Sequence, residues 1–222
     1  MRFLAENWLD RPGGTLASSV LIKGPSLRFD GKTEQIRVPG RGSMVFVDQR
    51  RKTPGRTRGK DTAASDSPLV SFSGQGNTLF EWVGDLTLDA RHNDVAMRDQ
   101  VKMTHLPAGK DEVLILDCRR LLADLEATGG LKAWMGDNVP RPDVKAVVAE
   151  GDVRVQHGSR SVHTDQLKYT GADDMVTLSA RQGRLTQVVD SGATNFSAQS
   201  MLWNLRTDRF EARDLGAVRF AP

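Results

Sequence analysis

The sequence has little of the chemistry that builds disulfide frameworks or metal centres. Cys118 is the only cysteine in 222 residues. One thiol forms neither an internal disulfide nor a cysteine-based metal site, so the redox compartment stays open. The four histidines are scattered, and we expect turn and surface roles for them rather than metal ligation. They are His92, His105, His157 and His163.

Long hydrophobic runs are also absent. The longest aliphatic runs, 113–116 and 146–149, are far shorter than the ~20 residues that a membrane helix needs. Residues 1–10 lack the apolar segment of a secretory signal, so work outside the cytoplasm would require a removed leader or a longer parent chain. With 38% hydrophobic and 27% charged residues, the composition predicts a globular protein, which we interpret as one elongated domain over 1–222.

The positive charge is concentrated in one stretch. The net charge is +3, and without the six basic residues of 50–60 the chain would hold more acidic than basic side chains. Proline and glycine accompany these charges and no aromatic residue does, which is unlike a nucleic-acid surface. We interpret 48–68 as a basic, flexible insertion loop, with contact to anionic phosphate as the alternative. Its basic residues are Arg50, Arg51, Lys52, Arg56, Arg58 and Lys60.

An internal repeat is the strongest signal in the sequence. Four stretches begin at Leu27, Leu86, Leu167 and Met201, and in each an apolar residue returns two positions later. An acid or amide stands seven positions after each start, and apolar residues return at nine and eleven. Alternation of this kind predicts two strands joined by a tight turn, so each unit is expected to be an antiparallel hairpin. The acid and amide positions are Glu34, Asn93, Asp174 and Asp208.

Further strands are expected between these units. The pattern predicts strands at 145–149, 152–156 and 184–189, the first two separated by Glu150 and Gly151. The segment 112–127 is ambiguous, because 118–126 has helix-forming residues while its apolar positions alternate. We favour a strand there because its neighbours are strands. A long loop is expected around 129–142.

One stretch resembles a known family. Residues 149–180 read AEGDVRVQHGSRSVHTDQLKYTGADDMVTLSA. This resembles the recurring phrase of the OstA-like family of lipopolysaccharide-transport proteins, which includes LptA, LptC and the N-terminal domain of LptD. The matching residues are Ala149, Gly151, Asp152, Val153, Asp165, Leu167, Tyr169, Val176 and Leu178. Thr164 stands where the family has a small Ala, and Ala180 where it has Gly. Looser copies span 80–105 and 198–220, and the faintest spans 26–46.

The resemblance implies an all-β fold, an open twisted β-jelly roll (β-taco) whose apolar inner face holds acyl chains. A trough of this kind suits lipid carriage, because each exposed CH₂ group costs about 0.8 kcal/mol in water. The alternative for any one residue is a dry core. The trough residues would be Leu27, Phe29, Ile36, Val38, Leu86, Leu88, Val95, Met97, Val153, Val155, Leu167, Tyr169, Val176, Leu178, Met201, Trp203 and Phe210. The basic residues of 50–60 would meet lipid phosphates.

The resemblance also implies partners and a location. Unpaired edge strands would pair with OstA-like domains or with a second copy, unless Arg209, Arg213 and Arg219 protect the last edge. The expected function is a non-enzymatic carrier of lipopolysaccharide or another amphipathic lipid, in the periplasm or cell envelope. The alternative is a structural β-repeat scaffold that binds proteins through its edges and carries no lipid.

Enzymatic chemistry has little support in the sequence. The chain contains neither a nucleophile elbow nor a phosphate-binding glycine loop, and we expect no catalytic residue, cofactor or metal. A glycan-active enzyme would need two carboxyl groups facing across a cleft. The candidate pairs are Asp85 with Asp89 and Asp173 with Asp174, the latter at an expected turn.

Overall fold

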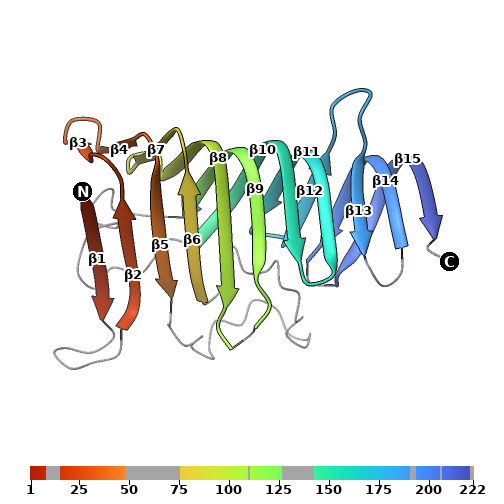
Figure 1. Cartoon of the computed structure of the whole chain (residues 1–222), viewed down its shortest axis with the longest axis horizontal. Helices are drawn as coiled ribbons and strands as arrows, with labels where there is room; N and C mark the ends of the chain where they lie inside the picture. The colour runs from red at the N-terminus through yellow and green to blue at the C-terminus, as the bar shows by residue number, and fades with distance from the viewer. Residues whose placement is uncertain are drawn as a thin grey trace.

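The protein is built from β-strands. The computed structural model describes residues 1–8, 16–48, 76–109, 111–126, 143–190, 194–205 and 207–220. Every helix or strand assigned in these ranges is a strand, which confirms the all-β class, and the strands form one 15-stranded sheet. They stand side by side along the long axis, with the chain termini at opposite ends (Figure 1). No helix in the described ranges is long and apolar enough to cross a membrane.

The strands differ strongly in length. The strands before β8 are short, and those from β8 onward are long except β12 and β13. They are β1 (Arg2–Trp8), β2 (Leu16–Lys23), β3 (Arg28–Asp30), β4 (Gln35–Pro39), β5 (Gly42–Asp48), β6 (Gly76–Trp82), β7 (Asp85–Asp89), β8 (Asp94–Pro107), β9 (Leu114–Glu126), β10 (Asp143–His157), β11 (Arg160–Thr170), β12 (Met175–Ser179), β13 (Thr186–Asp190), β14 (Thr194–Asn204) and β15 (Arg209–Phe220).

Three of the long strands, β8, β11 and β14, have different partners along their two halves. The first part of β8 pairs with β7 and its second part with β6. The first part of β11 pairs with β13 and its second part with β12. The same is true of β14. The sheet therefore divides into two half-sheets. Half-sheet A contains β3, β4, β7, 94–98, 120–126, 143–150, 166–170, β12, 200–204 and 209–213. Half-sheet B contains β1, β2, β5, β6, 101–107, 114–118, 153–157, 160–163, β13, 194–198 and 215–220.

The line where strands pass between the half-sheets is called the crease here. In β8 the pairing with β9 shifts between Arg98 and Val101, and the residues between them, Asp99 and Gln100, have φ of 59° and 50°. In β10 it shifts at Gly151 and Asp152, with φ of 80° and 53°. These are β-bulges, which bend a strand and increase its twist. The crease therefore folds one continuous sheet into two layers.

All four predicted hairpins are present. They are β3–β4, β7–β8, β11–β12 and β14–β15. The residue seven positions after each unit's start has positive φ: 53° at Glu34, 59° at Asn93, 50° at Asp174 and 52° at Asp208. Asn and Asp tolerate this left-handed conformation better than most residues, which explains the amide or acid at three of the four positions.

The hairpin turns also bond to their neighbours along half-sheet A. Ala90 N donates to Glu34 O at 3.1 Å, and Leu205 N donates to Asp174 O at 3.0 Å. Between them, Leu125 N donates to Asn93 O at 3.1 Å. Each hairpin turn is thus hydrogen-bonded to a neighbouring turn or strand at the edge of half-sheet A.

The ambiguous segment 112–127 forms a strand. Residues 114–126 are β9, which confirms the strand expected there. The expected break at Glu150 and Gly151 is wrong: 143–157 is one strand, and the glycine lies in a bulge within it. The loop at 129–142 lies outside the described residues. So does the basic loop 48–68, except Asp48, which ends β5.

The core lies between the two half-sheets. Buried residues from both belong to one hydrophobic cluster, for example Leu86 and Leu178 of half-sheet A with Leu114 and Val188 of half-sheet B. Trp82 and Trp203, one from each half-sheet, are among the largest fully buried side chains. The crease thus brings the apolar faces of a single sheet against each other.

The crease generates a stability prediction at Gly84. Val83 N and Gly84 N donate to Asp99 O and Arg98 O, and a Cβ at Gly84 would lie 2.9 Å from Arg98 O. We expect Gly84→Ala to lower the free energy of unfolding by about 1–3 kcal/mol in urea denaturation. Gly31→Ala is the control, since its Cβ would meet nothing closer than 3.6 Å. Equal effects of the two substitutions would contradict the close approach.

Candidate functional site

The predicted trough residues line the space between the half-sheets, where most of them are buried. Those below one-tenth exposure are Ile36, Val38, Leu86, Leu88, Val95, Met97, Val153, Val155, Leu167, Tyr169, Val176, Leu178, Met201 and Trp203. Side chains therefore fill the interior along the described length. Whether acyl chains can replace these contacts is not tested by burial, so the lipid-binding role of the set stays a prediction.

Three trough residues differ from the rest. Leu27 and Phe210 are partly buried and pack against the core. Phe29 is 52% exposed on β3, at the N-terminal end of half-sheet A. Met1, which precedes β1 of half-sheet B at the same end, is 70% exposed and lines a small pocket together with Leu27. The apolar interior thus reaches the surface at this end of the sheet.

The repeat template does not include most of the buried residues on the inner face of half-sheet B. Half-sheet B contributes buried residues that belong to none of the four repeat units: Ile22, Trp82, Val101, Met103, Leu114, Leu116, Val162 and Val188. Alternation at 101–105 and 114–118 carried the signal for several of them. The pattern was hidden because the crease shifts the buried set in β9 from Leu114, Leu116 and Cys118 to Leu121.

Two hydrogen-bonded pairs of polar side chains are buried among the apolar residues of the interior. Thr78 Oγ1 and His105 Nδ1 lie 2.8 Å apart and both residues are buried. Thr164 Oγ1 lies 2.8 Å from Thr186 Oγ1 and donates to Ser179 O. A buried hydroxyl needs such partners. The buried hydroxyl of Thr164 is therefore matched by that of Thr186 on the neighbouring strand.

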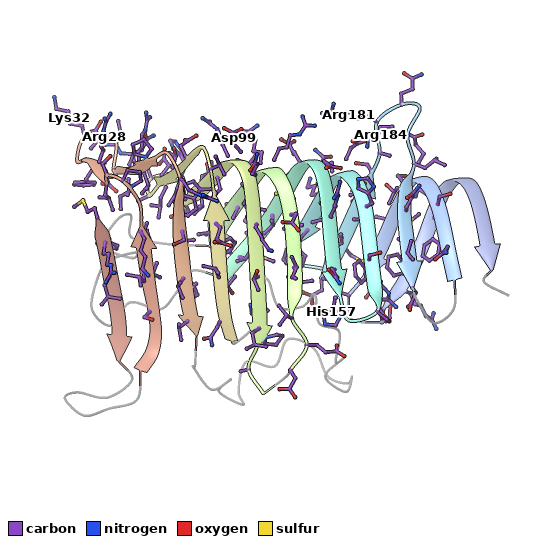
Figure 2. All side chains as sticks on the ribbon, viewed as in Figure 1. Arg28, Lys32, Asp99, His157, Arg181 and Arg184 are labelled. Carbon is purple, nitrogen blue, oxygen red and sulfur yellow. The ribbon has the colours of Figure 1, made fainter. Side chains whose placement is uncertain are left out.

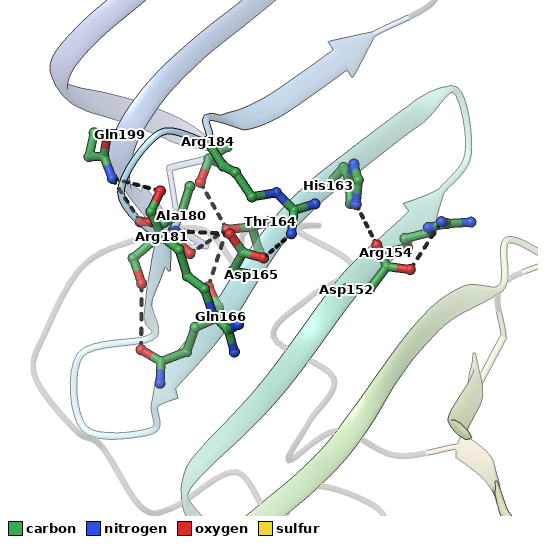
Figure 3. A network of polar contacts seen from close by, with 12 residues as sticks. Asp152, Arg154, His163, Thr164, Asp165, Gln166, Ala180, Arg181, Arg184 and Gln199 are labelled. Carbon is green, nitrogen blue, oxygen red and sulfur yellow. Dashed lines mark hydrogen bonds and ion pairs between the residues drawn. The ribbon is translucent and has the colours of Figure 1, made fainter. Parts of the chain in front are cut away.

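A polar network follows the crease (Figure 3). Asp165 is 7% exposed and accepts hydrogen bonds from Arg181 N at 2.9 Å and from Arg184 Nη1 at 2.7 Å. It thereby fixes the 180–185 connection between β12 and β13. Asp152 pairs with His163 at 2.7 Å and with Arg154 at 3.1 Å. The hydrogen bond from His163, opposed by burial, lowers the pKa of Asp152.

Arg160 joins the half-sheets at the side away from the crease, which is called the mouth here. It begins β11 in half-sheet B, and its Nη1 donates to Asp208 Oδ1 at 2.7 Å in the β14–β15 turn of half-sheet A. Its Nη2 donates to Asp190 Oδ2 at 3.3 Å. In Figure 2, His157, close in sequence to Arg160, lies at the bottom of the view, whereas Asp99, Arg181 and Arg184 lie at the top.

Aromatic rings complete this contact. The Arg160 guanidinium lies 5.6 Å from the centre of the Trp203 ring and 5.4 Å from that of Phe210. Those rings stack at 4.5 Å, and Trp203 Nε1 donates to Asp208 Oδ1. Burial disfavours the charge of Arg160, but the hydrogen bonds to Asp208 and Asp190 outweigh it, so the pKa of Arg160 lies above its ordinary value. The guanidinium is permanently charged.

A cavity of about 210 Å³ lies beside Arg160. Its apolar lining consists of Val155, Val162 and Trp203, which belong to the core. Its polar lining consists of Glu112, His157, Ser159, Arg160, Asp190 and Asp208. The cavity therefore extends from the mouth to the buried interior.

The carboxylate pairs have structural surroundings. Asp89 Oδ1 accepts from Arg91 N and His92 N in the β7–β8 turn. Burial opposes ionisation there, but the hydrogen bonds from His92 and Gln35 lower the pKa of Asp89 to about 2. Asp174 accepts from the Tyr169 hydroxyl at 3.1 Å. Among the described residues, no group of three or more acidic, histidine or cysteine side chains is arranged to hold a metal ion.

The predicted headgroup residues lie outside the described part of the chain. They are Arg50, Arg51, Lys52, Arg56, Arg58 and Lys60. Their contact with phosphate stays a prediction.

Comparison with known proteins gives structural likeness but no sequence match. No family model matches the chain, and no curated protein matches it. Among solved structures, the chain is similar to LptH from Pseudomonas aeruginosa, described as the LptA homologous periplasmic component of the conserved lipopolysaccharide transport device. The identity is 10%, the alignment covers 61% of this chain and 87% of that one, and the TM-score is 0.42. At this level the likeness carries no argument about function, and membership of the OstA-like family stays a prediction.

The buried thiol of Cys118 reports on how closed the interior is. Cys118 is 6% exposed, and burial, followed by the charge of Asp117, raises the pKa of its thiol to about 12. We expect no reaction with Ellman's reagent at pH 8 in the native protein and complete reaction in guanidinium chloride, because only the thiolate reacts. Complete native labelling within minutes would show that the half-sheets separate readily.

Proposed function

We propose that this chain is a non-enzymatic lipid-binding domain that transports or bridges lipopolysaccharide or a similar amphipathic lipid across the cell envelope. One observation carries the proposal: a largely apolar interior extends along the sheet between two half-sheets and reaches the surface beside Phe29. The acyl chains would lie between the half-sheets. The resemblance of 149–180 to the OstA-like phrase supports the same function and a periplasmic location.

The energetics favour such an exchange of contacts. The buried side chains that now pack against each other are largely aliphatic and aromatic, so an acyl chain would replace one apolar contact with another. Each CH₂ group removed from water would contribute about 0.8 kcal/mol. Binding therefore requires the half-sheets to separate without exposing their inner faces to water.

The ends of the sheet would supply the bridge. In the part of the chain that the structure describes, β1 pairs only with β2, β3 only with β4, and β15 only with β14. Unpaired strand edges present free backbone donors and acceptors to another chain. A domain of the same fold could extend the sheet at either end and continue the apolar interior.

A filled interior favours a second candidate, a structural scaffold that binds partner proteins through its edges and carries no lipid. Leu86, Leu167 and Leu178 are each 0% exposed, as expected for a permanent core. The two candidates share the edge strands and differ in whether lipid enters the interior.

Lipid loading tests the carrier. The purified protein is incubated with lipopolysaccharide and observed by native mass spectrometry. We expect a lipid adduct that is lost in Leu167→Asp and in Trp203→Glu, because a carboxylate in the interior repels acyl chains. Lys168→Asp is the matched control, since Lys168 is the exposed neighbour of Leu167 on β11.

Circular dichroism confirms that each variant is folded before loading is compared. If Leu167→Asp unfolds, Val155→Thr provides a nearly isosteric change in the same interior. Equal loading of a folded interior variant and the control would contradict the carrier, and protein multimers without lipid would support the scaffold.

A measurement of self-association tests whether exposed Phe29, at the N-terminal end of the sheet, contributes to an interface. Light scattering over a range of concentrations should show association that Phe29→Lys weakens about tenfold or more, since burial of a Phe side chain contributes at least about 1.5 kcal/mol. Thr33→Lys is the control, because it adds the same charge in the exposed β3–β4 turn. An identical association constant for the two variants would remove Phe29 from the interface.

A further inference from the structure

The Arg160 contact holds the mouth of the interior closed at one place. Asp190 anchors the guanidinium on half-sheet B, and Asp208 reaches it from half-sheet A. The side chains of Arg160 and Asp208 are 25% and 47% exposed. An ion pair this accessible to water is weak and is screened by salt. The ion pair between Arg160 and Asp208 can therefore break at little cost.

The adjoining cavity leads inward from this contact. At about 30 Å³ per molecule it has the volume of about seven waters, and ligand pockets are usually larger, about 300–1,000 Å³. It is too small for a whole amphiphile and large enough for the end of one alkyl chain. Its apolar lining, Val155, Val162 and Trp203, is at most 3% exposed. A chain end placed there would touch the core directly.

We propose that the cavity is the port through which an acyl chain enters sideways between the half-sheets, and that the Arg160–Asp208 ion pair gates it. This inference rests on the proposed function and adds the route of loading. Opening exposes Trp203 and its neighbours to water, which is unfavourable unless an alkyl chain covers them. The gate therefore opens productively only when lipid is present.

Asp208→Asn provides a clean test, because it removes the charge and keeps the structure. Asp208 has φ of 52°, a conformation that Asn adopts well. The Asn carbonyl oxygen can still accept the hydrogen bond from Trp203 Nε1. Arg160 keeps its pair with Asp190. The variant therefore weakens the electrostatic attraction between Arg160 and residue 208 and changes little else.

The matched control is Asp152→Asn at the crease. Asp152 also has positive φ, at 53°, is 42% exposed and also pairs with an arginine, Arg154. Each substitution therefore removes one negative charge from a residue in the same backbone conformation. Only Asp208 spans the mouth.

The experiment follows uptake of N-phenyl-1-naphthylamine, a dye that fluoresces in apolar surroundings, by stopped-flow mixing. We expect Asp208→Asn to raise the uptake rate up to about fivefold, the rate equivalent of a partly exposed ion pair worth up to about 1 kcal/mol. Added salt should accelerate the wild type and leave Asp208→Asn nearly unchanged. Asp152→Asn should behave as the wild type.

The outcomes separate the two proposals. If the wild type and Asp208→Asn take up the dye at the same rate, the proposed port is wrong while the carrier function stands. If both aspartate variants accelerate equally, the effect is general loosening and the gate is again overturned. If the wild type shows no uptake at equilibrium, the carrier function fails, and the port fails with it.

Discussion

The fold depends on a bend that every long strand makes at the crease. A single sheet with one apolar face would leave that face in water, and two separate sheets would need many more connections. Bulges at 98–101 in β8 and 150–153 in β10 instead let each strand serve both layers. Hydrogen bonding stays continuous while the apolar faces meet. The close approach at Gly84 and the buried bonds of Asp165 follow from this bend, because backbone crowds together where the strands turn.

The sequence predicts what is local. A turn needs a residue that tolerates positive φ at one position, and alternation on both sides needs only a few residues, so the four hairpins could be recognised from short windows. The bends could not, because a bulge shifts the alternation. In β11, both Thr164 and Asp165 are buried, and after them the buried positions change parity. In β9 the buried positions shift in the same way, from Leu116 and Cys118 to Leu121.

The arrangement at the mouth had no local signal at all. Arg160 lies 30 residues from Asp190 and 48 from Asp208 in the sequence, and neither Arg160 nor Asp190 belongs to the repeat template. Only Asp208 was marked, as a turn residue. Its side chain serves a second purpose, since it accepts hydrogen bonds from both Trp203 and Arg160. The apolar trough, by contrast, is partly visible in the sequence. The repeats define the inner face of half-sheet A, whereas in half-sheet B the prediction includes Val153 and Val155 but not most of the other buried residues.

The two sides of the folded sheet have different strengths, and this difference decides how it can open. At the crease the layers share covalent strands, backbone hydrogen bonds and buried pairs such as Thr164 with Thr186. At the mouth, Arg160 and Asp208 meet through partly exposed charged side chains. Separation of the layers should therefore begin at the mouth, with the crease as the hinge. The proposed carrier would use this asymmetry, because one side would yield while the other holds the layers in register.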